Sequence, residues 1–336
     1  MQKRNKEMKN LNEISNKIKI NFLIKNNKMK KENNITKDIT YRIDMGALNG
    51  YNTKCNLNCK YCHKDLFPLS YPFDCKELPT KSFVESISEL EKIFKHDKRK
   101  RKIHISGRAE PLMLNKNVLN QELNRINTNF PEIKKVLTTN GLLLKDKVEC
   151  LSNNGIKRIN VSMHNKLFKN NLYNNGIITA KNSGIDVFLN VIICKQSLKF
   201  LNEVFDFALH HKVSIKFFLE LGIEAEEANN LFQHIKYFLF QKTGNNGNID
   251  SKKNRQVYNI SENQKIYLKL PEVETPRPKA CEICKYREMC QESCWEAIRV
   301  TPWYIKPCGV RDDNVYFLCN NSIDDLKHKL KSGGKL

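Results

Sequence analysis

The chain lacks any apolar stretch that approaches the roughly 18 residues of a membrane-spanning helix. Its early apolar run, Ile20 to Ile24, is too short for the core of a secretory signal, and basic residues surround it. We therefore expect a protein of the reducing cytoplasm with no membrane partner, in which the twelve cysteines serve metal binding or catalysis rather than a disulfide framework.

Acidic residues are scarce. The 336 residues include 36 Asp and Glu against 58 Lys and Arg, a net charge of +22. Such a charge favours anionic partners such as phosphate esters, nucleic acid or acidic peptides. Lys and Asn are abundant along the whole chain, so a general compositional bias explains the charge equally well. The apolar fraction of 40% is enough for a packed core.

Composition divides the chain into four segments. Residues 1–38 carry eleven basic and four acidic residues with little apolar periodicity, which predicts a basic, partly disordered leader. Residues 39–242 alternate short apolar runs with helical stripes. Residues 243–270 begin with a stretch rich in Gly and Asn and are expected to be a linker or an excursion. Residues 271–336 hold six of the twelve cysteines and predict a small metal-stapled unit.

The central segment predicts an α/β fold. Its apolar runs predict six strands, which are Tyr41–Ala47, Lys102–Ser106, Lys135–Thr139, Arg158–Met163, Asp186–Ile193 and Ser214–Leu221. Helical stripes such as Thr80–Phe94 and Phe200–His211 lie between them. Six β/α repeats favour a parallel sheet, yet are too few for an eight-fold barrel. We therefore predict a partial, TIM-like (β/α)6 barrel with a small C-terminal cysteine-rich domain. Its site should lie at the carboxyl ends of the strands.

A group of three cysteines follows the first predicted strand. Cys55, Cys59 and Cys62 have the spacing C-x3-C-x2-C. Three neighbouring thiolates suit an iron–sulfur cluster, whereas a structural zinc site normally takes four ligands. A [4Fe–4S] cubane held by three thiolates keeps one iron open. That iron can chelate the amino and carboxylate groups of S-adenosylmethionine (SAM).

This spacing, with Tyr61 before the third cysteine, resembles the signature of the radical SAM superfamily. The resemblance implies an enzyme that cleaves SAM reductively to a 5′-deoxyadenosyl radical, which then abstracts hydrogen from a substrate. It implies a reductase partner such as flavodoxin or ferredoxin, and places Tyr61 beside the adenine of SAM. It identifies no further catalytic side chain.

Segments after the later strands extend the resemblance. The run from Ser106 to Pro111 resembles the Gly-Gly-Glu-Pro segment that binds the methionine amino group, although Arg108-Ala109 interrupts the expected glycines. The resemblance implies SAM contacts from residues at successive strand ends, namely Gly107, Glu110, Thr139, Asn140, Ser162 and Asn190.

The C-terminal cysteines form a second cluster motif. Their spacing is similar to the SPASM or twitch motif, which implies a second, auxiliary [4Fe–4S] cluster. The candidate ligands are Cys281, Cys284, Cys290, Cys294 and Cys308, with Cys319 undecided. Zinc is the alternative metal for this region, because the C-x2-C pair alone permits it.

The run Ile298–Thr301 after Cys294 resembles the corresponding run of the GTP 3′,8-cyclases of molybdenum-cofactor biosynthesis, but Ala297 stands where that family has an arginine. The resemblance implies a nucleotide or another phosphorylated small molecule as substrate, with Arg108, Arg299 and Arg311 as candidate phosphate contacts. One alternative is a SPASM-type peptide maturase that acts on a peptide substrate. The other is a non-enzymatic iron–sulfur or zinc module that binds nucleic acid.

Overall fold

The structure is a computed structural model, and it describes residues 38–49, 55–59, 62, 81–107, 109–163, 170–220, 223–250, 253, 255–270, 297–308 and 315–317. The expected basic leader and the cysteines from Cys281 to Cys294 lie outside these residues. No helix in the described ranges has both the length and the apolar character needed to cross a bilayer.

Six parallel strands form the centre of the sheet. They are β1 (Ile39–Ile43), β2 (Arg101–Ile105), β3 (Lys134–Thr139), β4 (Ile156–Met163), β5 (Asp186–Ile193) and β6 (Ser214–Leu219). They pair in chain order from β1 to β6. All six predicted strands are therefore confirmed, and their ends agree within a few residues except at β1. There the chain leaves the sheet after Ile43 and forms a 3-10 turn, η1 (Met45–Asn49).

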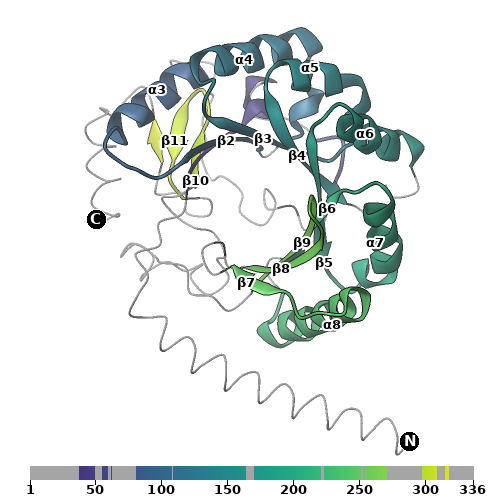
Figure 1. Cartoon of the computed structure of the whole chain (residues 1–336). Helices are drawn as coiled ribbons and strands as arrows, with labels where there is room; N and C mark the ends of the chain where they lie inside the picture. Colours follow the sequence, from purple (N-terminus) through teal and green to yellow (C-terminus); the bar gives the residue numbers. More distant parts are fainter. Residues whose placement is uncertain are drawn as a thin grey trace, which may run out of the picture. The chain divides into compact units, whose positions relative to one another are not determined.

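Helices lie on the outer side of the curved sheet (Figure 1). They are α3 (Phe83–Ile93), α4 (Lys116–Asn129), α5 (Val148–Asn153), α6 (Asn171–Asn182), α7 (Leu201–His210) and α8 (Ala225–Thr243). Three further short 3-10 turns are η2 (Pro111–Met113), η3 (Lys145–Lys147) and η4 (Ser197–Phe200). The apolar sides of the α-helices pack on the outward-facing residues of the strands, and together they make one continuous core. This arrangement confirms the predicted partial α/β barrel.

Local sequence fixes where α3 begins. Ser82 accepts a hydrogen bond from the Glu85 N–H at 3.2 Å, and the Glu85 carboxylate accepts one from the Ser82 N–H at 2.7 Å. This reciprocal capping box satisfies donors that the first helical turn leaves without partners. The helix predicted from residue 80 therefore starts at Phe83.

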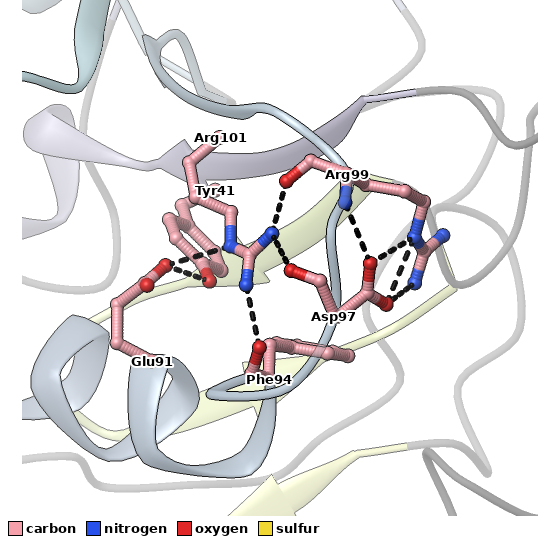
Figure 2. A network of polar contacts seen from close by, with 6 residues as sticks. All are labelled: Tyr41, Glu91, Phe94, Asp97, Arg99 and Arg101. Atoms are coloured by element: carbon pink, nitrogen blue, oxygen red, sulfur yellow. Dashed lines mark hydrogen bonds and ion pairs between the residues drawn. The ribbon is translucent and has the colours of Figure 1, made fainter.

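A polar network joins β1 and β2 to the end of α3 (Figure 2). The Tyr41 hydroxyl donates to Glu91, and Arg101 Nε lies 3.2 Å from the same carboxylate. The Arg101 guanidinium also donates to the carbonyl oxygen of Phe94 at 2.6 Å. Tyr41 thus points outward and is fully buried, so its neighbour Arg42 points into the barrel.

Two additions extend the sheet at its edges. After α8, β7 (Asn248–Asp250), β8 (Arg255–Ser261) and β9 (Gln264–Lys269) form an antiparallel excursion, and β9 pairs parallel with β6. Residues 243–270 are therefore an excursion of the sheet rather than a linker. The Gly- and Asn-rich stretch that suggested a linker supplies the turn after α8, where Gly244 adopts a φ of 68°.

The other addition comes from the C-terminal segment. There β10 (Ala297–Val300), β11 (Tyr304–Lys306) and β12 (Tyr316–Phe317) are joined by antiparallel pairing. β10 also pairs parallel with β1, with Arg42 opposite Arg299. The described part of residues 271–336 is thus continuous with the barrel sheet, which the sequence did not predict.

Candidate active site at the carboxyl ends of the strands

A cavity of about 490 Å³ lies inside the curve of the sheet. It reaches from the loops after β1, β2 and β3 down to residues in the middle of the strands. Ten of the residues singled out from sequence line it, namely Cys55, Cys59, Cys62, Gly107, Glu110, Thr139, Asn140, Ser162, Asn190 and Arg299. These ten residues therefore lie together near the carboxyl ends of the strands, where the site was expected.

Among the other predicted site residues, Cys308 alone lies in the described part of the chain. Tyr61, Arg108, Arg311 and the cysteines from Cys281 to Cys294 lie outside the described residues. Cys308 is described and buried just after β11, but it is not among the described residues that line the cavity.

The three N-terminal cysteines are reduced and partly buried, and all three line the cavity. The Cys62 N–H donates to the Cys59 carbonyl oxygen at 3.0 Å. Asn140, after β3, lies with its Nδ2 3.7 Å from Cys55 Sγ and donates to Asn56 Oδ1 at 2.6 Å. The loop after β3 thereby holds the first cysteine in position.

Glu110 is the centre of a buried network beside the cysteines. Its carboxylate accepts hydrogen bonds from Thr139 Oγ1 at 2.6 Å, the Asn140 N–H at 2.7 Å and the Leu112 N–H at 3.1 Å. Burial raises the pKa of the Glu110 carboxyl, while these three donors oppose the rise. The carboxylate therefore ties the loop after β2 to the loop after β3.

Gly107 allows an acidic side chain to approach the end of β2. A Cβ at Gly107 would lie 1.8 Å from Asp44 Oδ1, so a larger residue cannot occupy this position unless Asp44 moves. Asp44 also lines the cavity and its N–H donates to the Val300 carbonyl oxygen at 3.0 Å. The departure from two glycines in this segment is accommodated because Ala109 packs beside Gly46, whose own Cβ would lie 2.6 Å from that of Ala109.

The floor of the cavity holds a second polar network that sequence reasoning missed. His104 Nε2 lies 2.8 Å from Thr138 Oγ1, and Asn160 Nδ2 donates to the same hydroxyl at 3.2 Å. Lys216 Nζ donates to Asn160 Oδ1 at 2.6 Å. The signal was present, because His104 and Lys216 each stand between two apolar residues of a predicted buried strand.

Cationic side chains gather on the wall made by β1, β10 and β11. The register places Arg42 opposite Arg299, and Arg299 opposite Lys306. All three line the cavity, and Lys306 is only 3% exposed. Like charges at directly opposed sheet positions are destabilising, so this wall is suited to an anion. Arg42 and Lys306 were not predicted, because their position depends on the unforeseen pairing of β10 with β1.

The residues present fit the cofactors that the sequence motif implies. Three cysteine thiols that line one cavity have the number and chemistry of the ligands of a cubane, in which each thiolate takes a different iron. In the described ranges, no three His, Cys, Asp or Glu side chains are grouped tightly enough to hold one metal ion. Across the cavity, Asn190 Oδ1 is buried and accepts no hydrogen bond from the described residues, so it offers an acceptor to a polar ligand.

Comparison with known proteins agrees with this arrangement. Residues 51–165 match the model of the Radical SAM superfamily, which includes the three cysteines and the loops after β2 and β3. The segment that carries the three cysteines and the first strands of the sheet is therefore similar to the radical SAM superfamily. This likeness implies a [4Fe–4S] cluster and SAM as cofactors.

Over a longer part of its length the chain resembles GTP 3′,8-cyclases. It is 27% identical over 279 residues to a probable GTP 3′,8-cyclase of Methanococcus aeolicus, covering 78% of this chain and 84% of that protein. It is 30% identical over 252 residues to the GTP 3′,8-cyclase of Staphylococcus carnosus, covering 69% of this chain and 64% of that protein.

Solved structures share the fold at low sequence identity. Streptococcus suis SuiB bound to S-adenosylmethionine aligns with a TM-score of 0.51 and 16% identity, over 88% of this chain and 64% of SuiB. The enzyme anSMEcpe with bound AdoMet aligns with a TM-score of 0.54 and 13% identity, over 89% of this chain and 81% of that one. These likenesses establish the fold.

Proposed function

We propose that the chain cleaves SAM reductively in a reducing cytoplasm and uses the resulting radical to abstract hydrogen from an anionic small molecule. The observation that carries this proposal is one cavity lined by two chemically different groups of residues. Cys55, Cys59 and Cys62 line it together with the cationic wall of Arg42, Arg299 and Lys306. Cofactor and substrate would then share one enclosed space.

The cysteine side is suited to the cofactors. Cys55, Cys59 and Cys62 would hold the cluster, and Asn140 would keep the loop of Cys55 in place. When bound, the cluster and SAM supply a 5′-deoxyadenosyl radical after receiving one electron from a reductase such as flavodoxin or ferredoxin.

The remaining SAM contacts come from the strand ends. Gly107, Ser162 and Asn190 line the cavity and would contact SAM, while Glu110 and Thr139 would fix the loops that enclose it. The superfamily resemblance adds Tyr61 as the neighbour of the adenine. The side chains at these strand ends would therefore bind and orient the cofactor and exclude water, while the cofactor would supply the radical chemistry.

A phosphorylated substrate, such as a nucleotide, is favoured by charge. Among the described residues that line the cavity, four are Lys or Arg and two, Asp44 and Glu110, are acidic. Glu110 is committed to three hydrogen bonds in the cysteine-side network. The relatives that align over most of this chain are GTP 3′,8-cyclases, which supports a nucleotide. Arg108 and Arg311 remain further candidate phosphate contacts.

The proposal is tested with the anaerobically reconstituted full chain. Dithionite and SAM should give 5′-deoxyadenosine, measured by chromatography. Calorimetric titration with GTP, GMP and guanosine should show an affinity that rises with phosphate number and falls in Arg299→Ala. A conservative Lys92→Arg change on α3, away from the cavity, serves as the matched control and should leave both readouts unchanged.

Two other outcomes would change the assignment. Failure to bind any of the three probes, together with SAM cleavage stimulated by a peptide, would establish the peptide maturase instead. Absence of SAM cleavage, together with salt-dependent binding of nucleic acid, would establish the non-enzymatic module.

We also propose an auxiliary [4Fe–4S] cluster held within Cys281, Cys284, Cys290, Cys294 and Cys308, which would position the substrate or exchange electrons. The support is the spacing of these cysteines. Replacing Cys55, Cys59 and Cys62 together by Ala should leave about four irons per chain, the content of one cubane. Zinc, or no metal, in that triple variant would refute the second cluster.

A further inference from the structure

Three exposed apolar side chains lie at the carboxyl-end face of the barrel. In the described part of the chain, Met113 and Val118 are each 39% exposed and Leu172 is 59% exposed. Met113 ends η2, Val118 lies in the first turn of α4 and Leu172 lies in the first turn of α6. All three belong to segments that follow β2 or β4, and we call them the apolar patch. Neighbouring exposed apolar side chains mark surfaces that bind other proteins.

The patch is continuous because the loops beneath it contact one another. Lys147, after β3, donates through Nζ to the Leu114 carbonyl oxygen at 3.2 Å, which joins this loop to the segment after β2. A Cβ at Gly176 would lie 3.1 Å from the Lys145 nitrogen, so α6 lies close against η3. Leu172 is four residues before Gly176 and therefore lies on the same side of α6. Figure 1 shows α4, α5 and α6 as neighbours around the outer ring.

Hydrogen bonds connect the patch to the first cysteine. Asn140 Nδ2 lies 3.7 Å from Cys55 Sγ, and the Asn140 N–H donates to the Glu110 carboxylate at 2.7 Å. The same carboxylate accepts from the Leu112 N–H at 3.1 Å, and Leu112 immediately precedes Met113. A short run of packed, hydrogen-bonded groups thus leads from a thiol that would hold the cluster to the exposed surface.

Charge distinguishes the patch from the rest of this face. The loops of the patch carry three lysines and two acidic residues, which are Lys116, Lys145, Lys147, Asp146 and Glu149. The segment after β6 carries four glutamates and no basic residue, and these are Glu220, Glu224, Glu226 and Glu227. An acidic protein would be attracted by the net charge of +22 but repelled from the β6 side, so the patch is where it can approach.

We propose that the apolar patch is the docking surface for an acidic protein that carries one electron to the cluster. The inference rests on the proposed function, which requires such a carrier. One electron passes from the docked carrier to the cluster, so the carrier is oxidised by one electron, and no bond forms or breaks. Electron-transfer complexes bury little surface, so a small apolar patch with a charged rim is sufficient.

The test compares a protein carrier with a small reductant that needs no docking surface. The anaerobically reconstituted chain is mixed with dithionite, or with a purified flavodoxin kept reduced by NADPH and a flavodoxin reductase. Loss of visible absorbance gives the rate of cluster reduction, and 5′-deoxyadenosine is measured in parallel. Val118→Glu and Met113→Glu should each slow reduction by flavodoxin roughly tenfold or more, because the new charge repels the carrier and loses water in the contact. Reduction by dithionite should not change.

Leu209→Glu is the matched control. Leu209, on α7, is 38% exposed, which is close to the exposure of Met113 and Val118. The substitution adds the same charge outside the patch and should change neither rate. Lys145→Glu examines the rim of the patch. It should slow reduction by flavodoxin at low ionic strength, and the difference should shrink in high salt because exposed charges are screened.

The other outcomes decide against the docking surface or against the proposed function. Equal rates with flavodoxin in Val118→Glu, Leu209→Glu and the unchanged chain would overturn the docking surface. So would slowing in both patch variants that dithionite shows equally, because the change would then lie at the cluster. A flavodoxin that does not reduce the unchanged chain, when dithionite does, would also reject it.

The two readouts keep this inference separate from the proposed function. Cluster reduction that depends on the patch, in a chain that forms no 5′-deoxyadenosine with either reductant, would support the docking surface and reject the proposed enzyme. Formation of 5′-deoxyadenosine at equal rates in all variants would leave the proposed enzyme intact and reject the docking surface. Thermal melting of each variant shows that the fold is retained.

Discussion

The two sides of the cavity are built on different physical principles. On the cysteine side, the buried Glu110 carboxylate is matched by three donors. In the cationic wall, the register aligns Arg42, Arg299 and Lys306 at opposed positions. The hydrogen bonds of Glu110 tie two loops together, whereas the register of the wall brings cations next to one another. The comparison teaches that one cavity can combine a hydrogen-bonded carboxylate with a cluster of cations.

The largest effect should come from removing a thiolate on the cysteine side. In Cys59→Ala only two of the three predicted cluster ligands remain, so formation of 5′-deoxyadenosine should be abolished. Chromatographic product analysis and iron content, both measured anaerobically, check this expectation. Cys150→Ala, a buried thiol on α5, is the matched control and should retain product formation. Equal turnover in Cys59→Ala would reject the cluster assignment.

The next largest effect should come from the cationic wall. Lys306→Met removes a buried charge while keeping the length of the side chain. We expect it to weaken binding of GTP by roughly 10- to 150-fold, equivalent to about 1.5–3 kcal/mol. Titration calorimetry measures the change, and Lys306→Arg should restore most of the affinity. Unchanged binding in Lys306→Met would show that the wall does not contact the ligand.

A smaller effect should follow from Glu110→Gln. The amide keeps one acceptor oxygen but turns an NH2 group toward the Leu112 N–H or the Asn140 N–H, so one hydrogen bond is lost in a buried site. We expect a loss of about 1–3 kcal/mol in the free energy of unfolding, with weaker SAM binding. Chemical denaturation and SAM titration check these effects. Glu132→Gln, at an exposed position just before β3, should change neither, because substitutions of exposed side chains usually alter stability little.

The smallest expected effect is the coupling between the cysteine side and the cationic wall. If the two sides act separately, Lys306→Met should alter SAM binding little and Glu110→Gln should alter GTP binding little. In the double variant the two losses should add within about 0.5 kcal/mol. A larger coupling, measured by titrating each ligand in all four proteins, would show that the two sides form one cooperative unit.

The sequence was sufficient to predict the central fold and the cysteine side. Six apolar runs separated by helical stripes specified the parallel strands, because each strand is buried on its outer face under a helix. The polar residues that end these strands, such as Glu110 and Asn140, were found because parallel strands bring their carboxyl ends to one edge. Local order along the chain was therefore enough for this side.

The cationic wall could not be predicted in the same way. Arg42 becomes a neighbour of Arg299 through pairing between segments far apart in the chain, and no local pattern specifies that register. Lys306 faces Arg299 across the β10–β11 hairpin, which joins the sheet only through this pairing. Strands β7 to β9 were missed for another reason. They follow a Gly- and Asn-rich stretch, and such composition hides the short alternating runs behind it.

The pairing of β1 with β10 also has a consequence for synthesis. Thr40, near the start of the described chain, pairs with Ala297, so most of the polypeptide must leave the ribosome before β1 acquires this neighbour. Until then the edge of β1 exposes unpaired backbone groups, which is the condition that promotes aggregation of nascent chains. Contacts of such long sequence separation also slow folding. A truncated chain that ends before residue 297 should therefore need chaperone assistance more than the full-length protein does.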